Sequence, residues 1–456
     1  MAAKKYEIDM CSGPILPKLL KLTLPLMLSS VLQLLFNAAD IIVVGNFASD
    51  NSLAAVGSTS SLVNLVTNLF LGLSTGANVM TSRYMGAKDD VRVSKTVHTS
   101  IFLSIVSGAI LTVIGVLFAD KMLLLMKTPT EVLDLSTLYL RIYFCGMIAM
   151  MIYNFGSSIL RSKGDTKRPL YYLTFAGIVN VGLNLIFVIF LKMDVAGVAL
   201  ATVISQCVSA LLIIRCLMKE TDAFRFSFKK LLPDRVITGK ILGIGFPAGF
   251  QGVVFSLSNV VIQSSINSFG PIVMAGSAAA ASIEGFVWVS MNAFSQGALT
   301  FTSQNIGAAK YSRINRIALI SCSCAAAAGL ILGNLAYLFG DVLLGIYDPR
   351  PEIIPPGLTR MSLVCVFYFT CGLMDCIVGS IRGMGYAVTP TIVSLLGACG
   401  LRILWIFTIF TIPEYHTEFM LFLSYPISWT ITFAAHFICY LFMRRRFPKH
   451  DLPTGS

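Results

Sequence analysis

Long apolar runs separated by short polar segments make up most of this chain. Twelve runs are long enough to cross the hydrocarbon core of a bilayer, which takes about 20 residues of helix. They lie at about 18–45, 52–81, 94–118, 134–160, 169–191, 195–217, 239–268, 273–304, 314–340, 358–381, 388–412 and 418–443. No stretch remains for a separate soluble domain, so the pattern predicts an all-α polytopic membrane protein with twelve transmembrane helices.

The longest charged segment lies midway along the chain, between the sixth and seventh predicted spans. Its sequence is KETDAFRFSFKKLLPDR at 219–235. We expect a cytoplasmic linker at 219–238 that joins two six-helix bundles, one at 1–218 and the other at 239–456.

The two halves repeat one pattern at an offset of 221 or 222 residues. Because each half holds an even number of spans, the copies share one orientation and are related by an axis along the membrane normal. This organisation is typical of transporters that work by alternating access. The matched segments are TLPLMLSSVLQLLFN (23–37) with GFPAGFQGVVFSLSN (245–259), STGANVMTSRYMGAKDD (74–90) with SQGALTFTSQNIGAAKY (295–311), and ILRSKGDTKRP (159–169) with SIRGMGYAVTP (380–390).

Composition and charge agree with a membrane protein. Apolar residues make up 56% of the chain and charged residues only 12%, about half the usual charged share. The net charge of +12 does not indicate nucleic-acid binding, because most of the Lys and Arg residues fall in alternate loops. By the positive-inside rule these loops and both termini are predicted to be cytoplasmic, in the cell inner (plasma) membrane. The few basic residues expected on the other side are Lys121, Lys127, Lys192, Arg350 and Arg360.

Other kinds of chemistry leave no signature in the sequence. The 11 cysteines form no C-x-x-C pair, and no G-x-x-x-x-G-K-[ST] segment that would bind nucleotide phosphates is present. We therefore expect no cofactor, no ATP hydrolysis and no enzyme activity, so that any uphill transport must use an ion gradient.

Ionisable residues within spans are candidate functional residues because they are costly to insert into a bilayer. In the first half Asp40 shares one helix face with Gln33 and Asn37. Its carboxyl group can bind a cation or a proton. The alternative is a solvated charge at the outer end of the helix.

The fifth predicted span carries Asn180 and Asn184 one turn apart, and the sixth carries Thr202. Amide oxygens near one carboxylate suit a hard cation such as Na⁺. Hydrogen bonding between helices explains the two asparagines equally well, and the residues alone do not choose between these interpretations.

The second half contains Glu284, Asp375 and Arg402 within spans, and Trp288 lies on the same face as Glu284. These residues either line a cavity that attracts cationic substrates, or Arg402 forms a structural salt bridge with Asp375 or Glu284.

Several separated motifs resemble the multidrug and toxic compound extrusion (MATE) family. They include NAADIIVVGNF, GSSILRSKGDTKRP, GSIRGMGYAVTP, VNVGLNLIFV and GVALATVIS, and the resemblance spans essentially the whole chain. It implies a V-shaped pair of bundles and the antiport of mostly cationic, lipophilic compounds against Na⁺ or H⁺. The ion site of the family's first half corresponds here to Asp40, Asn180, Asn184 and Thr202, which makes these residues a candidate Na⁺ site.

This chain departs from the family pattern in two places. Some branches have Asp at the position of Asn184, so the single carboxylate of Asp40 is expected to exchange one proton or one Na⁺. The seventh-span acid of one branch is replaced here by Phe255, so that branch's second-half cation site is not transferred.

The sequence therefore predicts a secondary active multidrug efflux transporter that exports small lipophilic or cationic compounds in exchange for H⁺ or Na⁺. We expect a monomer whose partners are its substrates and membrane lipids. The alternative is a lipid-linked oligosaccharide flippase of the same superfamily. It is disfavoured because acidic residues outnumber basic residues within the predicted spans. A channel or receptor is disfavoured by the repeat with its ionisable residues within the spans.

Overall fold

The computed structural model describes residues 6–47, 49–126 and 128–452. Nearly all of this part of the chain is helical, and none of it forms a β-strand. It contains 11 helices that are long and apolar enough to cross a membrane, and a bent helix pair makes a twelfth span. The prediction of an all-α polytopic membrane protein is confirmed.

The chain divides into two compact units. Unit 1 contains the described residues up to Asp9 and the segment Leu28–Gly249, and unit 2 contains Met10–Met27 and the segment from Phe250 onward. The helices of unit 1 are most of α1 (Ile15–Phe47), α2 (Asp50–Gly86), α3 (Asp90–Leu125), α4 (Thr130–Cys145), α5 (Met147–Ser162), α6 (Lys167–Asn184), the π-helical η2 (Leu185–Phe190), α7 (Asp194–Met218), the short 3₁₀-helix η3 (Phe228–Lys230) and the first part of α8 (Arg235–Asn267).

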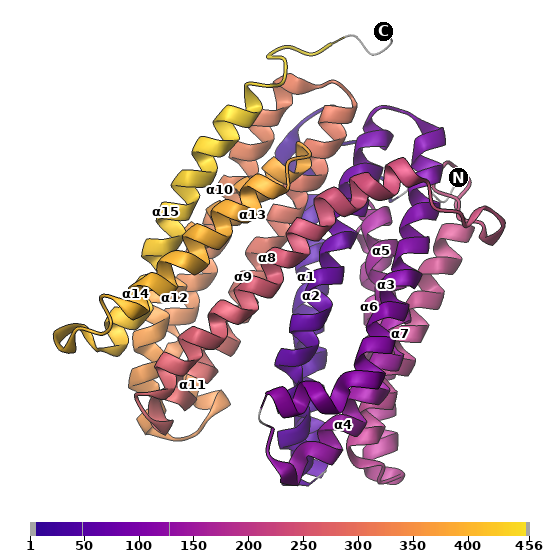
Figure 1. Ribbon diagram of the computed structural model, residues 1–456. Coiled ribbons are helices and arrows are strands. Elements are labelled where there is room, and N and C mark those ends of the chain that lie inside the picture. The colour runs from indigo at the N-terminus through magenta and orange to yellow at the C-terminus, as the bar shows by residue number, and fades with distance from the viewer. Residues whose placement is uncertain (1–5, 48, 127, 453–456) are drawn as a thin grey trace. The chain divides into compact units, whose positions relative to one another are not determined.

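Unit 2 repeats this order of long helices. It contains the rest of α8, α9 (Pro271–Gly307), η4 (Tyr311–Arg313), α10 (Ile314–Leu338), α11 (Gly340–Tyr347), η5 (Pro351–Ile353), α12 (Ile354–Gly383), α13 (Val388–Ser394), the π-helical η6 (Leu395–Gly400), α14 (Leu401–Phe407), η7 (Pro413–Tyr415) and α15 (Glu418–Arg444). In Figure 1, α15 (yellow) runs alongside α12. Buried side chains such as Met291, Val364 and Phe422 form the apolar core of this unit.

The first helix of each half is shared between the two units. The division falls after Met27 in α1 and after Gly249 in α8, shortly beyond Pro25 and Pro247. The boundaries predicted from the sequence assign each helix whole to one bundle, whereas the compact units divide both helices.

Close backbone packing holds the first part of α8 within unit 1. A Cβ atom on Gly249 would meet the carbonyl oxygen of Leu69, and one on Gly245 would lie 2.5 Å from the Cα atom of Leu73. Only glycine allows this approach of α8 to α2. In unit 2 the first part of α1 packs in the corresponding way on α9, where Gly297 faces Leu19.

The predicted fourth span, 134–160, is a bent pair of helices in the structure. The axes of α4 and α5 differ by 47° at a break at Gly146. A Cβ atom at Gly146 would lie 2.7 Å from Oε1 of Gln206. The absence of a side chain at Gly146 leaves room for Gln206 of α7 at this break.

The internal repeat extends to backbone conformation. Gly164 and Gly385, which follow α5 and α12, have φ angles of 90° and 98°. Lys88 and Ala309, which follow α2 and α9, have φ angles of 54° and 55°. Because left-handed residues are uncommon outside glycine, their recurrence at one offset supports the repeat independently of sequence similarity.

Candidate functional site

The structure brings the predicted first-half ion residues together in unit 1. The Nδ2 atom of Asn184 donates a hydrogen bond of 2.5 Å to Oδ1 of Asp40, which joins α6 to α1. Asn184 also donates to Oδ1 of Asn180 over 3.4 Å, and Asn180 donates to the hydroxyl oxygen of Thr202 over 3.4 Å. Four polar side chains from α1, α6 and α7 thus form one connected group.

This group offers oxygen atoms to a cation. Oδ1 of Asn184 is buried and has no hydrogen-bond partner among the described residues. A buried acceptor without a donor is costly, and a bound cation would supply the missing interaction. Asp40 forms no ion pair within the described part of the chain, and its neighbours include the phenols of Tyr139 and Tyr143. The donor set therefore fits a hard cation such as Na⁺.

The other two first-half candidates are less enclosed. Gln33 and Asn37 are exposed on α1, whereas Asp40 is half-buried. The shared helix face is present, but the contacts that organise the polar group come from α6 and α7. A role for Gln33 and Asn37 in the substrate path stays a prediction.

In unit 2 the partner of Glu284 is Arg360. Nε and Nη2 of Arg360 each donate a hydrogen bond of 2.7 Å to the Glu284 carboxylate, and Nη1 donates to Ser277 over 2.8 Å. Arg360 is buried in α12, so it lies within a helix rather than in a loop, and its predicted side of the membrane stays a prediction. The helix begins earlier than the charge pattern indicates, and the bidentate pair satisfies a buried guanidinium. A salt bridge between Glu284 and Arg402 is likewise not formed.

Arg402 has a different environment on α14. Its Nε atom donates to the hydroxyl group of Ser428 over 2.8 Å. The guanidinium carbon lies 4.1 Å from the ring centre of Tyr425 and 5.2 Å from that of Trp429. No carboxylate of the described residues is within ion-pair distance, and Nη2 is buried without a hydrogen-bond acceptor. The predicted alternative of a structural salt bridge from Arg402 to Asp375 is therefore wrong.

The energetics of Arg402 indicate a charge that is only partly compensated. Inserting an Arg at the centre of a span costs about 2.5–3.5 kcal/mol on translocon scales. A desolvated contact between a cation and an aromatic face returns about 2 kcal/mol. Tyr425 and Trp429 can therefore hold the guanidinium within the helix bundle, but they do not neutralise its charge or satisfy Nη2.

Asp375 lies one turn beyond Cys371 on α12 and is half-buried. Its carboxylate lies near Trp288 of α9, a residue that is 42% exposed. This brings together two of the predicted cavity residues. Glu284 and Arg402 have other partners.

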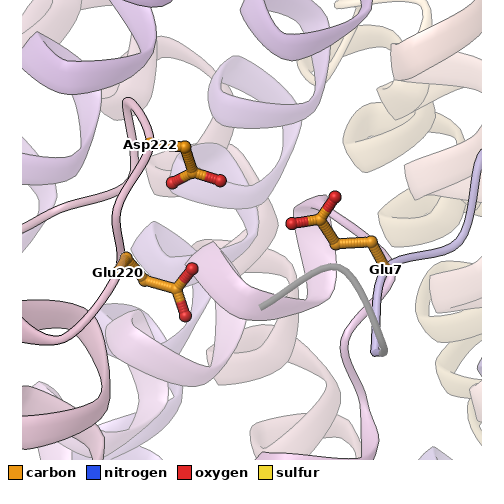
Figure 2. Close-up of side chains that lie close together, drawn as sticks. All are labelled: Glu7, Glu220 and Asp222. Carbon is orange, nitrogen blue, oxygen red and sulfur yellow. The ribbon is translucent and has the colours of Figure 1, made fainter. Parts of the chain in front are cut away.

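A second ionic cluster in unit 1 was not predicted. Figure 2 shows the carboxylates of Glu7, Glu220 and Asp222 pointing toward one another, and their spacing would suit a metal ion. The Nζ atom of Lys163 lies among them, at 3.1, 2.7 and 3.3 Å respectively, and this side chain is fully buried. The ammonium group thus takes the place that a metal ion would occupy.

The cluster connects the N-terminal segment, the turn after α5 and the segment after α7. Burial alone lowers the pKa of Lys163, but the hydrogen bond and negative charge of Glu220, together with Asp222 and Glu7, raise it above its ordinary value of 10.5. Because the ion pairs favour the charged form in the folded state, we interpret this cluster as structural.

The residues that sequence reasoning missed share a recognisable signal. Tyr139 and Tyr143 near Asp40, and Tyr425 and Trp429 around Arg402, are aromatic pairs spaced four residues apart on a helix. That spacing puts both rings on one face. Aromatic pairs with this spacing would therefore have indicated the side chains that surround Asp40 and Arg402.

Comparison with known proteins gives a consistent family. The MatE family model matches residues 25–186 and 247–408, which are the two copies of the repeat. Among curated relatives, the probable multidrug resistance protein YpnP of Bacillus subtilis is 27% identical, over 86% of this chain and 88% of that protein. The probable multidrug resistance protein NorM of Thermotoga maritima is 25% identical, over 83% of this chain and 82% of its own.

Solved structures share the fold. A crystal structure of MATE in the straight conformation has a TM-score of 0.88 at 21% identity and covers 96% of this chain and 98% of its own. An outward-facing multidrug resistance MATE family transporter has a TM-score of 0.86 at 22% identity, with 96% and 97% covered. With the family model matched over both halves, the chain belongs to the MatE family and is a multi-pass membrane transporter rather than an enzyme.

Proposed function

We propose that the protein is a secondary active multidrug efflux transporter that exports small lipophilic compounds in exchange for H⁺ or Na⁺. Relatives named as multidrug resistance proteins support this drug-export function. The observation that carries the ion coupling is the hydrogen-bonded group of Asp40 and Asn184, with its buried acceptor at Oδ1 of Asn184.

The chemistry of coupling follows from the charge of Asp40. Its carboxylate has no basic partner among the described residues, so an external cation must neutralise it when water is excluded. One carboxylate binds one proton or one Na⁺. If the cation is Na⁺, Asn180, Asn184 and Thr202 add neutral oxygen ligands. The cation stabilises the conformation that encloses it, and the loss of the cation favours the other conformation.

The basic loops support an orientation for this cycle. Lys and Arg concentrate in alternate loops, and the positive-inside rule favours those loops on the cytoplasmic side. We propose a plasma-membrane location with both termini inside the cell, so that export carries substrate away from the face that bears the linker between α7 and α8.

Cationic compounds are the substrate class that Asp375 supports. Among the described residues, no basic group lies at ion-pair distance from this carboxylate, and Trp288 beside it is exposed. The carboxylate can attract a lipophilic cation by charge, and the indole can contact it through its aromatic face. The excess of acidic over basic residues that the sequence predicted within the spans does not add to this argument, because Arg360 neutralises Glu284.

Transport in proteoliposomes tests the coupling. The purified protein is reconstituted, and efflux of a fluorescent lipophilic cation is followed under an imposed Na⁺ gradient or an imposed pH gradient. We expect transport that follows one gradient, and Asp40→Asn should reduce it to the level of protein-free vesicles. Asp134→Asn, on an exposed part of α4, is the matched control and should transport like the unmodified protein.

Two results would contradict the proposal. Gradient-driven efflux by Asp40→Asn at the normal rate would show that this carboxylate does not couple transport. If the unmodified protein responds to neither gradient, the antiport mechanism fails, and translocation of a fluorescent lipid-linked sugar in the same vesicles would then favour the flippase.

A further inference from the structure

The guanidinium group of Arg402 is a buried span charge of unit 2 that has no carboxylate partner among the described residues and leaves Nη2 without a hydrogen-bond acceptor. Its neighbours include the phenols and thiols of Tyr425, Cys371, Cys399 and Tyr368. Arg360, by contrast, has its charge and donors matched by Glu284 and Ser277. The pair Arg360 and Glu284 is neutral as a unit, so Glu284 does not compensate the charge of Arg402.

The walls around Arg402 are aromatic and buried. The ring centres of Trp429 and Tyr425 are 5.5 Å apart, and those of Trp429 and Tyr368 are 5.1 Å apart. All three side chains are less than 10% exposed. Ser428 engages Nε, which orients the guanidinium. Nη2 remains buried with an unused donor.

From these contacts we propose that Arg402 binds the acidic group of an exported compound, a carboxylate or phosphate attached to an aromatic or lipophilic body. Arg presents a planar fork of donors that matches the two oxygens of such a group. The rings of Tyr425, Trp429 and Tyr368 would contact the body of the compound. The inference rests on the proposed transport function and adds a substrate class to it.

Binding of three matched pyrene probes in detergent micelles tests the proposal. The probes are 1-pyrenebutyrate, its uncharged amide and 4-(1-pyrenyl)butyltrimethylammonium. The unmodified protein should bind the carboxylate about tenfold or more tightly than the amide, the effect of a hydrogen-bonded charge pair. Arg402→Gln should abolish this preference. Arg402→Lys should keep part of it, because the positive charge remains although the planar set of guanidinium donors is lost. Arg141→Gln, an exposed arginine of α4, should bind all probes normally.

Three outcomes would overturn the proposal. The first is that the unmodified protein shows no preference for the carboxylate. The second is that Arg402→Gln loses affinity equally for all three probes, as a structural role requires. The third is that the acid binds without being exported. The third is checked by measuring efflux of pyrenebutyrate from proteoliposomes. If pyrenebutyrate is not exported and phosphatidylglycerol competes with it for binding, Arg402 binds a lipid headgroup instead. Micelle binding needs no gradient, so these results are independent of whether ion coupling holds.

Discussion

The two halves of this transporter treat charged side chains within spans differently. In unit 1, Asp40 belongs to a group of neutral amides and a hydroxyl, and no basic side chain among the described residues pairs with it. In unit 2, Glu284 and Arg360 neutralise each other in a buried bidentate pair, while Arg402 has only aromatic rings and Ser428. The comparison separates charges that stabilise the fold from charges that remain available to an ion or a substrate.

The pair of Glu284 and Arg360 should show the largest effect on stability. Arg360→Met leaves the carboxylate buried without a partner and should reduce the free energy of unfolding by about 3–5 kcal/mol. The double variant Glu284→Gln and Arg360→Met should recover most of that loss, because the remaining side chains are uncharged. Unfolding in detergent, followed by circular dichroism, measures both. Additive losses in the double variant would refute the pairing.

Lys163 should have a somewhat smaller effect in unit 1. Lys163→Gln removes the cation among Glu7, Glu220 and Asp222 and should destabilise the protein by about 3 kcal/mol, because Glu220 is buried and the other two are partly solvated. Lys167→Gln, an exposed neighbour on α6, should unfold like the unmodified protein. Equal unfolding of both variants would mean that the cluster does not hold these segments.

The pH dependence of this effect has a defined sign. Since the pKa of Lys163 in the folded protein lies above its ordinary value of 10.5, its stabilisation is present below that pH. It is lost as the pH rises through the folded-state pKa. The difference in melting temperature between the unmodified protein and Lys163→Gln should be constant from pH 7 to 9 and shrink above about 10.5. A difference that grows with pH would contradict the ion-pair interpretation.

Disturbing the packing of α8 on α2 should reduce the free energy of unfolding by less than the loss of either ionic cluster. Gly249→Ala places a methyl group against the carbonyl oxygen of Leu69 and should cost about 1–3 kcal/mol through overpacking. Gly239→Ala, in the same helix with nothing within 4 Å of the added atom, should be neutral or slightly stabilising. Thermal unfolding of the two variants side by side gives the comparison, and equal melting temperatures would argue against the close approach.

Asp40 should have the smallest effect on stability, although its effect on transport is expected to be complete. Asp40→Asn removes a carboxylate that has no cationic partner in unit 1, so the free energy of unfolding should change by less than about 1 kcal/mol. Unfolding in detergent, followed by circular dichroism, measures this change in free energy. A loss as large as that of Arg360→Met would place Asp40 among the structural charges and would end the distinction between the halves.

The sequence alone determined the class of fold and the internal repeat. Apolar runs of span length mark membrane helices because the bilayer demands about 20 apolar residues whatever the helices contact. Motifs such as those around Pro25 and Pro247 are local, so they could be matched directly. The proximity of Asn184 to Asp40 was expected from the family resemblance, and the structure brings the two side chains into contact.

Only the tertiary structure decided how the charges are paired. Arg360 follows Glu284 by 76 positions, and nothing in the local pattern distinguishes its partnership from one with Arg402. The choice depends on which helices pack together and on the need to satisfy a buried guanidinium. The division of α1 and α8 between the units has the same origin. Glycines such as Gly249 permit a close backbone approach, but the sequence does not say which helix will make it.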